Sequence, residues 1–75
     1  MPAAEIIDAR GLKCPLPVLK AEKRLRALAP GQRLTLFADD PVARVDIPLL
    51  CRRGGHGCTI ARQGEALAFT ITKAI

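Results

Sequence analysis

The sequence Cys14-Pro15-Leu16-Pro17 is the part of the chain whose residue types could do chemistry. The spacing predicts that Cys14 is the N-cap of a helix and that Pro15 is its first residue, where the missing proline N–H costs nothing. A cysteine at a helix N-terminus has a lowered pKa, because the macrodipole and the free N–H groups stabilise a thiolate. We therefore interpret Cys14 as a nucleophile. The alternative is a buried structural cysteine.

Charged and rigid residues surround this cysteine. Arg10 and Lys13 add positive charge within a few residues, which would favour a thiolate and also a persulfide anion. Pro15 and Pro17 have φ fixed at about −65°, so we expect them to hold the sulfur rigidly near the exposed end of the first strand.

The hydrophobic pattern predicts six elements in the order β-α-β-α-β-β. The expected strands cover residues 5–9, 33–38, 58–62 and 66–73. The last two strands are joined by a tight hairpin at Gln63-Gly64-Glu65. Two helices on one face of a four-stranded mixed sheet make a two-layer α/β sandwich, which we expect as a single domain over residues 1–75.

The first helix should run from Pro15 to the stop at Pro30-Gly31. Its apolar positions recur at helical spacing and should face the core: Val18, Ala21, Leu25 and Leu28. The second helix should end at Gly54-Gly55, because glycine readily adopts the conformation that terminates a helix.

The start of the second helix is less regular. Asp40 is well placed to cap a helix, but Pro48 would break the hydrogen-bonded ladder of a helix that began at the next residue. Either the helix kinks, or Asp46 caps a fresh start that places Pro48 in the first turn. We expect one short turn and then a helix through about Arg53. Asp39, Asp40 and Asp46 could form an acidic cluster, but the nearby prolines explain two of them as helix starters, and we favour capping.

The composition excludes several classes of protein. With 49% hydrophobic and 25% charged residues, the chain resembles an ordinary folded domain rather than a disordered tail. No run approaches the roughly 18 apolar residues of a membrane span, and the N-terminus lacks the pattern of a signal peptide, so we expect a cytoplasmic protein. The three unevenly spaced cysteines do not make a disulfide framework and should be free thiols.

Positive charge is concentrated early in the chain. The net charge is +5, and residues 10–33 carry many basic side chains against the single acid Glu22. Such a region attracts nucleic acid, acidic proteins or anionic ligands, although a solvated helix face is the plainer interpretation. Only Phe37 and Phe69 could stack on bases, so we do not expect direct nucleic-acid binding. Phe37 should lie on the sheet face that the helices leave uncovered, where it could mark a docking patch.

Cys51, His56 and Cys58 could join Cys14 as four zinc ligands. No Cys-x-x-Cys pair is present, and Cys51 and Cys58 fall at positions that favour core packing, so we expect no metal site. His56 follows two glycines and is interpreted as a solvated or locally hydrogen-bonded histidine. A contact with a partner, or weak acid-base chemistry, is the alternative.

The chain resembles the TusA/SirA family of small sulfurtransferases over nearly its whole length. The family's hallmark is Cys-Pro-x-Pro at the start of the first helix, preceded by Gly-Leu, and the matching residues are Gly11, Leu12, Cys14, Pro15 and Pro17. The downstream segments ADDP, DIP and GGH also occur at family-like spacing.

This resemblance implies a sulfur carrier, a transferase that works without metal or organic cofactor. Cys14 would attack a persulfide on a donor protein, commonly a cysteine desulfurase, and pass the sulfane sulfur to a thiol of an acceptor protein. Proteins that resemble this chain feed tRNA thiolation, molybdenum-cofactor assembly or oxidation of inorganic sulfur. We expect a monomer that acts in transient complexes.

Two other functions are compatible with parts of the pattern. A non-catalytic regulatory domain could use the basic first helix to hold RNA or an acidic protein. A redox thiol protein is a third possibility, disfavoured because no resolving cysteine lies near Cys14 in the sequence.

Overall fold

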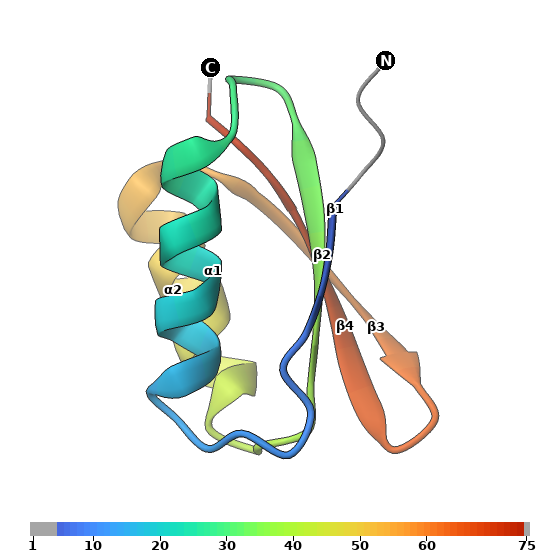
Figure 1. Ribbon diagram of the computed structural model, residues 1–75. Coiled ribbons are helices and arrows are strands. Elements are labelled where there is room, and N and C mark those ends of the chain that lie inside the picture. The colour runs from blue at the N-terminus through green and yellow to red at the C-terminus, as the bar shows by residue number, and fades with distance from the viewer. Residues whose placement is uncertain (1–4, 75) are drawn as a thin grey trace.

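The computed structural model describes residues 5–74 as one four-stranded sheet with two helices on one of its faces (Figure 1). The strands are β1 (Glu5–Asp8), β2 (Arg33–Ala38), β3 (Gly57–Gln63) and β4 (Ala66–Thr72). Their order in the sheet is β1-β2-β4-β3, with β1 parallel to β2 and the other neighbours antiparallel. The expected two-layer sandwich with a mixed sheet is confirmed.

Helices α1 (Leu16–Ala27) and α2 (Ala43–Gly54) lie side by side on the same face of the sheet (Figure 1). The expected buried stripe of α1 is confirmed, because Ala21 and Leu25 are buried and Val18 and Leu28 pack against the core. Within residues 5–74, neither helix is long and apolar enough to cross a bilayer.

The hydrophobic core fills the space between the helices and the sheet. Leu34 and Leu36 of β2 and Phe69 and Ile71 of β4 are fully buried, and Ile47 of α2 packs into the same cluster. Alternate residues of a strand point to the same face, so the period-two pattern identified this face correctly. Each of these side chains stabilises the fold by about 1.5–3 kcal/mol through its burial.

Helix α2 begins before Asp46 and continues through Pro48. Asp40 caps the preceding turn, since its carboxylate accepts the Val42 N–H at 2.9 Å and its carbonyl oxygen accepts the Ala43 N–H at 3.0 Å. The short turn before the helix and its end near residue 53 are confirmed. The fresh start at Asp46 is wrong, because the helix tolerates Pro48, whose missing N–H cannot bond the carbonyl of Arg44.

The face of the sheet opposite the helices is uncovered (Figure 1). Phe37 lies on this face as expected, in register with Asp8 of β1 and Ala68 of β4. The guanidinium carbon of Arg10 lies 6.0 Å from the centroid of the Phe37 ring. Phe37 is therefore only half-exposed, partly shielded by a side chain from the neighbouring loop.

The two loops that lead into the helices lie at the same end of the molecule (Figure 1). Because β1 and β2 are parallel, their carboxyl ends meet there, and residues 9–15 lie beside residues 39–42. Both helices begin at this end and run toward the other one. This arrangement brings residues about a third of the chain apart into one site.

Candidate functional site

Cys14 lies in the loop between β1 and α1, at the end of the molecule where both helices begin (Figure 1). Its side chain is half-buried, because it packs against the core cluster while part of it reaches the surface. Leu12, two residues earlier, packs against the same cluster and anchors the loop. Gly11 has φ of 82°, a left-handed conformation that glycine adopts without strain.

Helix α1 begins one residue later than the sequence indicated. Pro15 is the N-cap, Leu16 is the first helical residue, and Cys14 precedes the cap. The expectation that Cys14 is the N-cap is therefore wrong. The Leu16 N–H donates to the carbonyl oxygen of Lys13 at 2.9 Å, so it is not directed at the sulfur, and Pro17 has no N–H to offer.

Two neighbouring carboxylates in the segment that follows β2 form hydrogen bonds with the cysteine loop. Asp39 accepts the backbone N–H of Gly11 at 3.0 Å, and Asp40 accepts the backbone N–H of Cys14 at 2.8 Å. The other carboxylate oxygen of Asp40 accepts the Val42 N–H, so this one side chain joins the cysteine loop to the turn before α2. The interpretation of Asp40 as a helix starter was correct but incomplete. Parallel pairing of β1 and β2, which brings their carboxyl ends together, was the available signal.

The electrostatic environment raises the pKa of the Cys14 thiol, contrary to the expected lowering. Partial burial is the largest cause, and the negative charges of Asp40 and Asp46 add to it. The nearby Asp46 carboxylate, as an acceptor for the thiol proton, raises this pKa further. Cys14 is therefore a thiol in the free protein at neutral pH.

Asp40 itself is firmly ionised. The N–H groups of Val42 and Cys14 lower the pKa of its carboxyl group, and the positive charge of Lys13 lowers it further. The exposed Lys13 therefore faces the acidic side of the site, where it offsets part of the charge that opposes a Cys14 thiolate.

Arg10 directs its charge away from the thiol. Its Nε lies 2.8 Å from Oδ1 of Asp8, and its Nη2 lies 2.9 Å from Oδ2 of the same carboxylate. These hydrogen bonds lower the pKa of Asp8 to about 2. The sequence grouped Arg10 with Lys13, but the structure pairs Arg10 with Asp8 and places it beside Phe37 on the other side of the sheet.

The other two cysteines lie together in the core, apart from Cys14. Cys51 is 1% exposed, and its burial, together with the neighbouring Cys58 thiol, raises its pKa to about 12. Cys58 is half-buried and packs against the core as expected. Nδ1 of His56 accepts the backbone N–H of Ala74 at 2.9 Å, in agreement with a locally hydrogen-bonded histidine.

Potential metal ligands do not gather anywhere in the part of the chain that the structure describes. Residues 5–74 contain no group of three or more His, Cys, Asp and Glu side chains that could hold a metal ion. Asp39 and Asp40 accept backbone N–H groups of the cysteine loop, which explains their positions without a metal.

Comparison with known proteins places this site in a family. The model of the family described as Sulfurtransferase TusA matches residues 5–73. The chain belongs to the TusA family. The match includes the Cys-Pro-x-Pro segment and the Asp39-Asp40 pair, so the resemblance inferred from the sequence is confirmed.

Individual relatives agree with this TusA assignment. The chain is 47% identical over 65 residues to the sulfur carrier protein TusA of Pseudomonas paraeruginosa, which covers 87% of this chain and 81% of that protein. It is 49% identical over 61 residues to the sulfur carrier protein TusA of Pseudomonas aeruginosa, covering 81% of this chain and 76% of that one. The crystal structure of a SirA-like protein from Desulfitobacterium hafniense superposes with a TM-score of 0.84 and 26% identity, over 93% of this chain and 97% of that chain.

Proposed function

We propose that this protein is a sulfur carrier that receives a sulfane sulfur on Cys14 from a donor protein and relays it to an acceptor protein. The observation that carries this proposal is the fixed position of Cys14, whose backbone is held by Asp40 while its sulfur remains partly exposed. Membership of the TusA family supports sulfur transfer as the chemistry.

The transfer consists of two thiol exchange steps. In the first step the Cys14 thiolate attacks the outer sulfur of the donor persulfide, the donor S–S bond breaks, and the donor leaves as a thiolate. In the second step an acceptor thiolate attacks the outer sulfur now on Cys14, and Cys14 leaves as a thiolate. The sulfane sulfur keeps its oxidation state throughout, so neither step requires a redox cofactor or a metal.

Because the pKa of the Cys14 thiol is raised, we infer that the partner protein promotes its deprotonation. The free carrier holds a protonated thiol beside Asp40 and Asp46, which makes it a poor target for oxidants and alkylating agents. A donor that brings positive charge to this end of the molecule would offset the two carboxylates and release the thiolate. In this proposal the nucleophile becomes active only inside a complex with its partner.

The proposal extends to the compartment, the sulfur donor, the sulfur acceptor and the oligomeric state. We assign the protein as a transferase of the cytoplasm, loaded by a cysteine desulfurase or another persulfide donor, and active as a monomer in transient complexes. Its acceptor belongs to tRNA thiolation, molybdenum-cofactor assembly or oxidation of inorganic sulfur. Gly11 and Leu12 shape the cysteine loop, and Pro15 and Pro17 hold it at the start of α1.

The alternative of a non-catalytic domain that binds through its first helix has less support. Two of the arginines on α1 already face acids within the protein, since Arg24 pairs with Glu5 and Arg26 lies 3.9 Å from Glu22. The family that matches is described as a sulfurtransferase, which favours a chemical role for Cys14 over a purely structural one.

A direct test is incubation with a cysteine desulfurase and cysteine, followed by mass spectrometry. The protein should gain the mass of one sulfur atom on Cys14, and a reductant should remove it. Cys14→Ser should remain folded and fail to load, whereas Cys51→Ala and Cys58→Ala should load normally. A Cys14→Ser variant that still gained the sulfur would overturn the assignment of the site and return the binding-domain alternative.

A further inference from the structure

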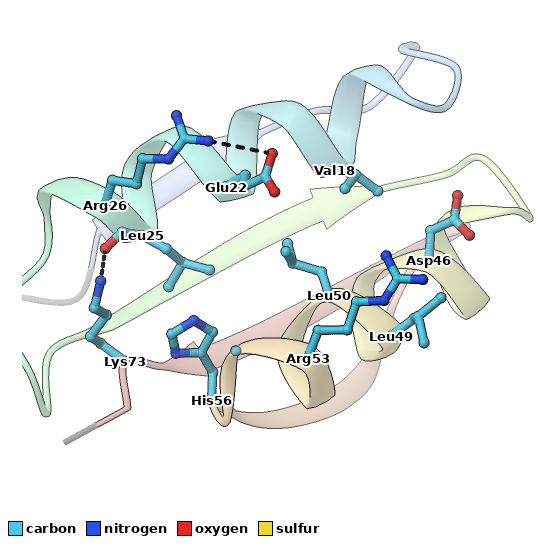
Figure 2. A pocket seen from close by; sticks show the side chains of 11 residues that line it. Val18, Glu22, Leu25, Arg26, Asp46, Leu49, Leu50, Arg53, His56 and Lys73 are labelled. Carbon is cyan, nitrogen blue, oxygen red and sulfur yellow. Dashed lines mark hydrogen bonds and ion pairs between the residues drawn. The ribbon is translucent and has the colours of Figure 1, made fainter.

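An open groove of about 510 Å³ runs between α1 and α2 on the surface of the helical layer (Figure 2). Its apolar strip is formed by Val18 and Leu25 of α1 together with Leu49 and Leu50 of α2. Leu49 is 40% exposed, although most side chains of its size pack into the core of a small domain. The groove therefore offers apolar surface that the chain does not itself cover.

One end of this groove reaches the reactive cysteine. Val18 lies in the first turn of α1 and Asp46 in the first turn of α2, so both lie at the end of the helical layer where the Cys14 loop lies (Figure 1). The negative charge of Asp46 is close enough to raise the pKa of the Cys14 thiol. A molecule that lies along the groove therefore has one end beside the sulfur.

Three basic side chains and the acid Glu22 line the rest of the groove, and Glu22 lies 3.9 Å from Arg26. Arg26 and Lys73 lie at the end away from Asp46, and Arg53 extends from the last turn of α2 along the groove (Figure 2). Nζ of Lys73 donates to the carbonyl oxygen of Leu25 at 2.5 Å, which holds its charge at the mouth of the groove. Within residues 5–74, Arg53 and Lys73 form no ion pair, so their charge is available to a partner.

We propose that this groove is the docking site for an extended, acidic segment of the protein that supplies the sulfur. Carboxylates of that segment would lie against Arg53 and Lys73, and its apolar side chains would cover the strip between the helices. This inference rests on the proposed function, because it assigns the groove to the donor of the Cys14 persulfide. It adds a recognition surface that directs the donor's sulfur toward Cys14.

The length and lining of the groove favour a peptide over a nucleic acid. Helix α1 has 12 residues and is about 18 Å long, which an extended segment of about five or six residues would span. Among the described residues, no Phe, Tyr or Trp lines the groove, so His56 is the one ring on which a base could stack.

The helix offers a matched pair of variants. Arg52 and Arg53 are neighbours in the last turn of α2, both are exposed, and both interact equally with the helix C-terminus, but only Arg53 lines the groove. Arg53→Glu should weaken binding of a cysteine desulfurase by roughly tenfold, whereas Arg52→Glu should change it by less than about twofold. The affinity of the wild-type protein should also fall more steeply with salt than that of Arg53→Glu.

The experiment measures desulfurase binding by calorimetry and the rate of persulfide loading by mass spectrometry. Loading of Cys14 by inorganic polysulfide serves as a parallel reaction that needs no docking, and it should be the same in the wild-type protein and both variants. Thermal unfolding checks that both variants are folded.

The possible outcomes distinguish a failure of the proposed docking site from a failure of the proposed sulfur-transfer function. Equal effects of Arg53→Glu and Arg52→Glu on donor binding would overturn the docking site and leave the sulfur carrier intact. Failure of wild-type Cys14 to load with either donor would overturn the proposed function itself. If Arg53→Glu left donor binding unchanged but abolished binding of an RNA oligonucleotide, the groove would be a nucleic-acid site instead.

Discussion

The Asp40 carboxylate accepts the backbone N–H of Cys14 at 2.8 Å, across 26 positions of sequence. This contact has two opposing effects. It fixes the backbone of Cys14, but its negative charge raises the pKa of the thiol that we propose as the nucleophile. The same side chain thus positions Cys14 and holds it in the protonated state.

Asp40→Asn should lower the pKa of the Cys14 thiol, because it removes a negative charge and keeps an oxygen that can accept the Cys14 N–H. Part of the elevation should remain, since burial is its largest cause. Alkylation of Cys14 by iodoacetamide, measured against pH in the Cys51→Ala/Cys58→Ala background, should therefore become faster at neutral pH.

Two further variants separate charge from position. Asp39→Asn also changes a carboxylate that holds the loop, but Asp39 is not among the causes of the raised pKa, so the Cys14 thiol should titrate as in the wild type. Asp40→Ala removes the acceptor as well and should cost about 1–3 kcal/mol of stability in urea unfolding. An unchanged thiol titration in Asp40→Asn would contradict the electrostatic role of Asp40.

Charge reversal at Lys13 should slow desulfurase loading by roughly three- to tenfold, because Lys13 offsets the negative charge of Asp40 and faces an approaching partner. Reversal at Arg10 should have a smaller effect on loading, since its charge is paired with Asp8. Both side chains are exposed, so thermal unfolding should change little. Equal slowing by the two reversals would show that Arg10 acts on the thiol after all.

Cys51 should make the protein less stable as the solution becomes alkaline. Its pKa is raised to about 12 by burial and by the neighbouring Cys58 thiol, whereas an unfolded cysteine has a pKa of about 8.5. The stabilisation is fully present below pH 8.5 and is lost as the pH rises toward 12, with a limiting slope of about 1.4 kcal/mol per pH unit. Urea unfolding between pH 8 and pH 10 should show a steeper loss in the wild type than in Cys51→Ala. Parallel curves would mean that Cys51 ionises as easily in the folded protein.

The purified protein should contain no stoichiometric metal. Nδ1 of His56 already accepts the Ala74 N–H, and Cys51 and Cys58 face each other in the core without a third ligand among the described residues. Metal analysis should find less than one zinc per chain, and EDTA should leave the thermal unfolding curve unchanged. One zinc per chain, with unfolding on chelation, would refute this prediction.

The sequence predicted the fold because its local and global signals agree. Alternation in β2 and β4 identified Leu34, Leu36, Phe69 and Ile71 as the inner face, and helical spacing identified the buried stripe of α1. Pro48 was misleading, because the packing of the buried Ile47, which helps to keep the helix continuous across the missing hydrogen bond, cannot be judged from local sequence.

The candidate site was predicted less completely. Cys14 was proposed from its neighbours in the sequence, but its electrostatics depend on Asp40 and Asp46. The pairing of β1 with β2 and the packing of α2 beside α1 bring these two carboxylates close to it. Local sequence suggested that the nearby Arg10 and Lys13 would dominate. Arg10 instead bonds its close neighbour Asp8, and no spacing rule could distinguish these partners.

The distance of Cys14 from the other two cysteines affects the lifetime of the persulfide that we propose on Cys14. A persulfide close to a second free thiol decays, since that thiol attacks the inner sulfur, forms a disulfide and releases sulfide. Cys51 lies two turns along α2 from Ala43, about 11 Å from the end that holds Cys14, and it faces Cys58 within the core. Neither Cys51 nor Cys58 is therefore placed to attack the proposed Cys14 persulfide. That persulfide should persist until an acceptor binds, without release of its outer sulfur as sulfide.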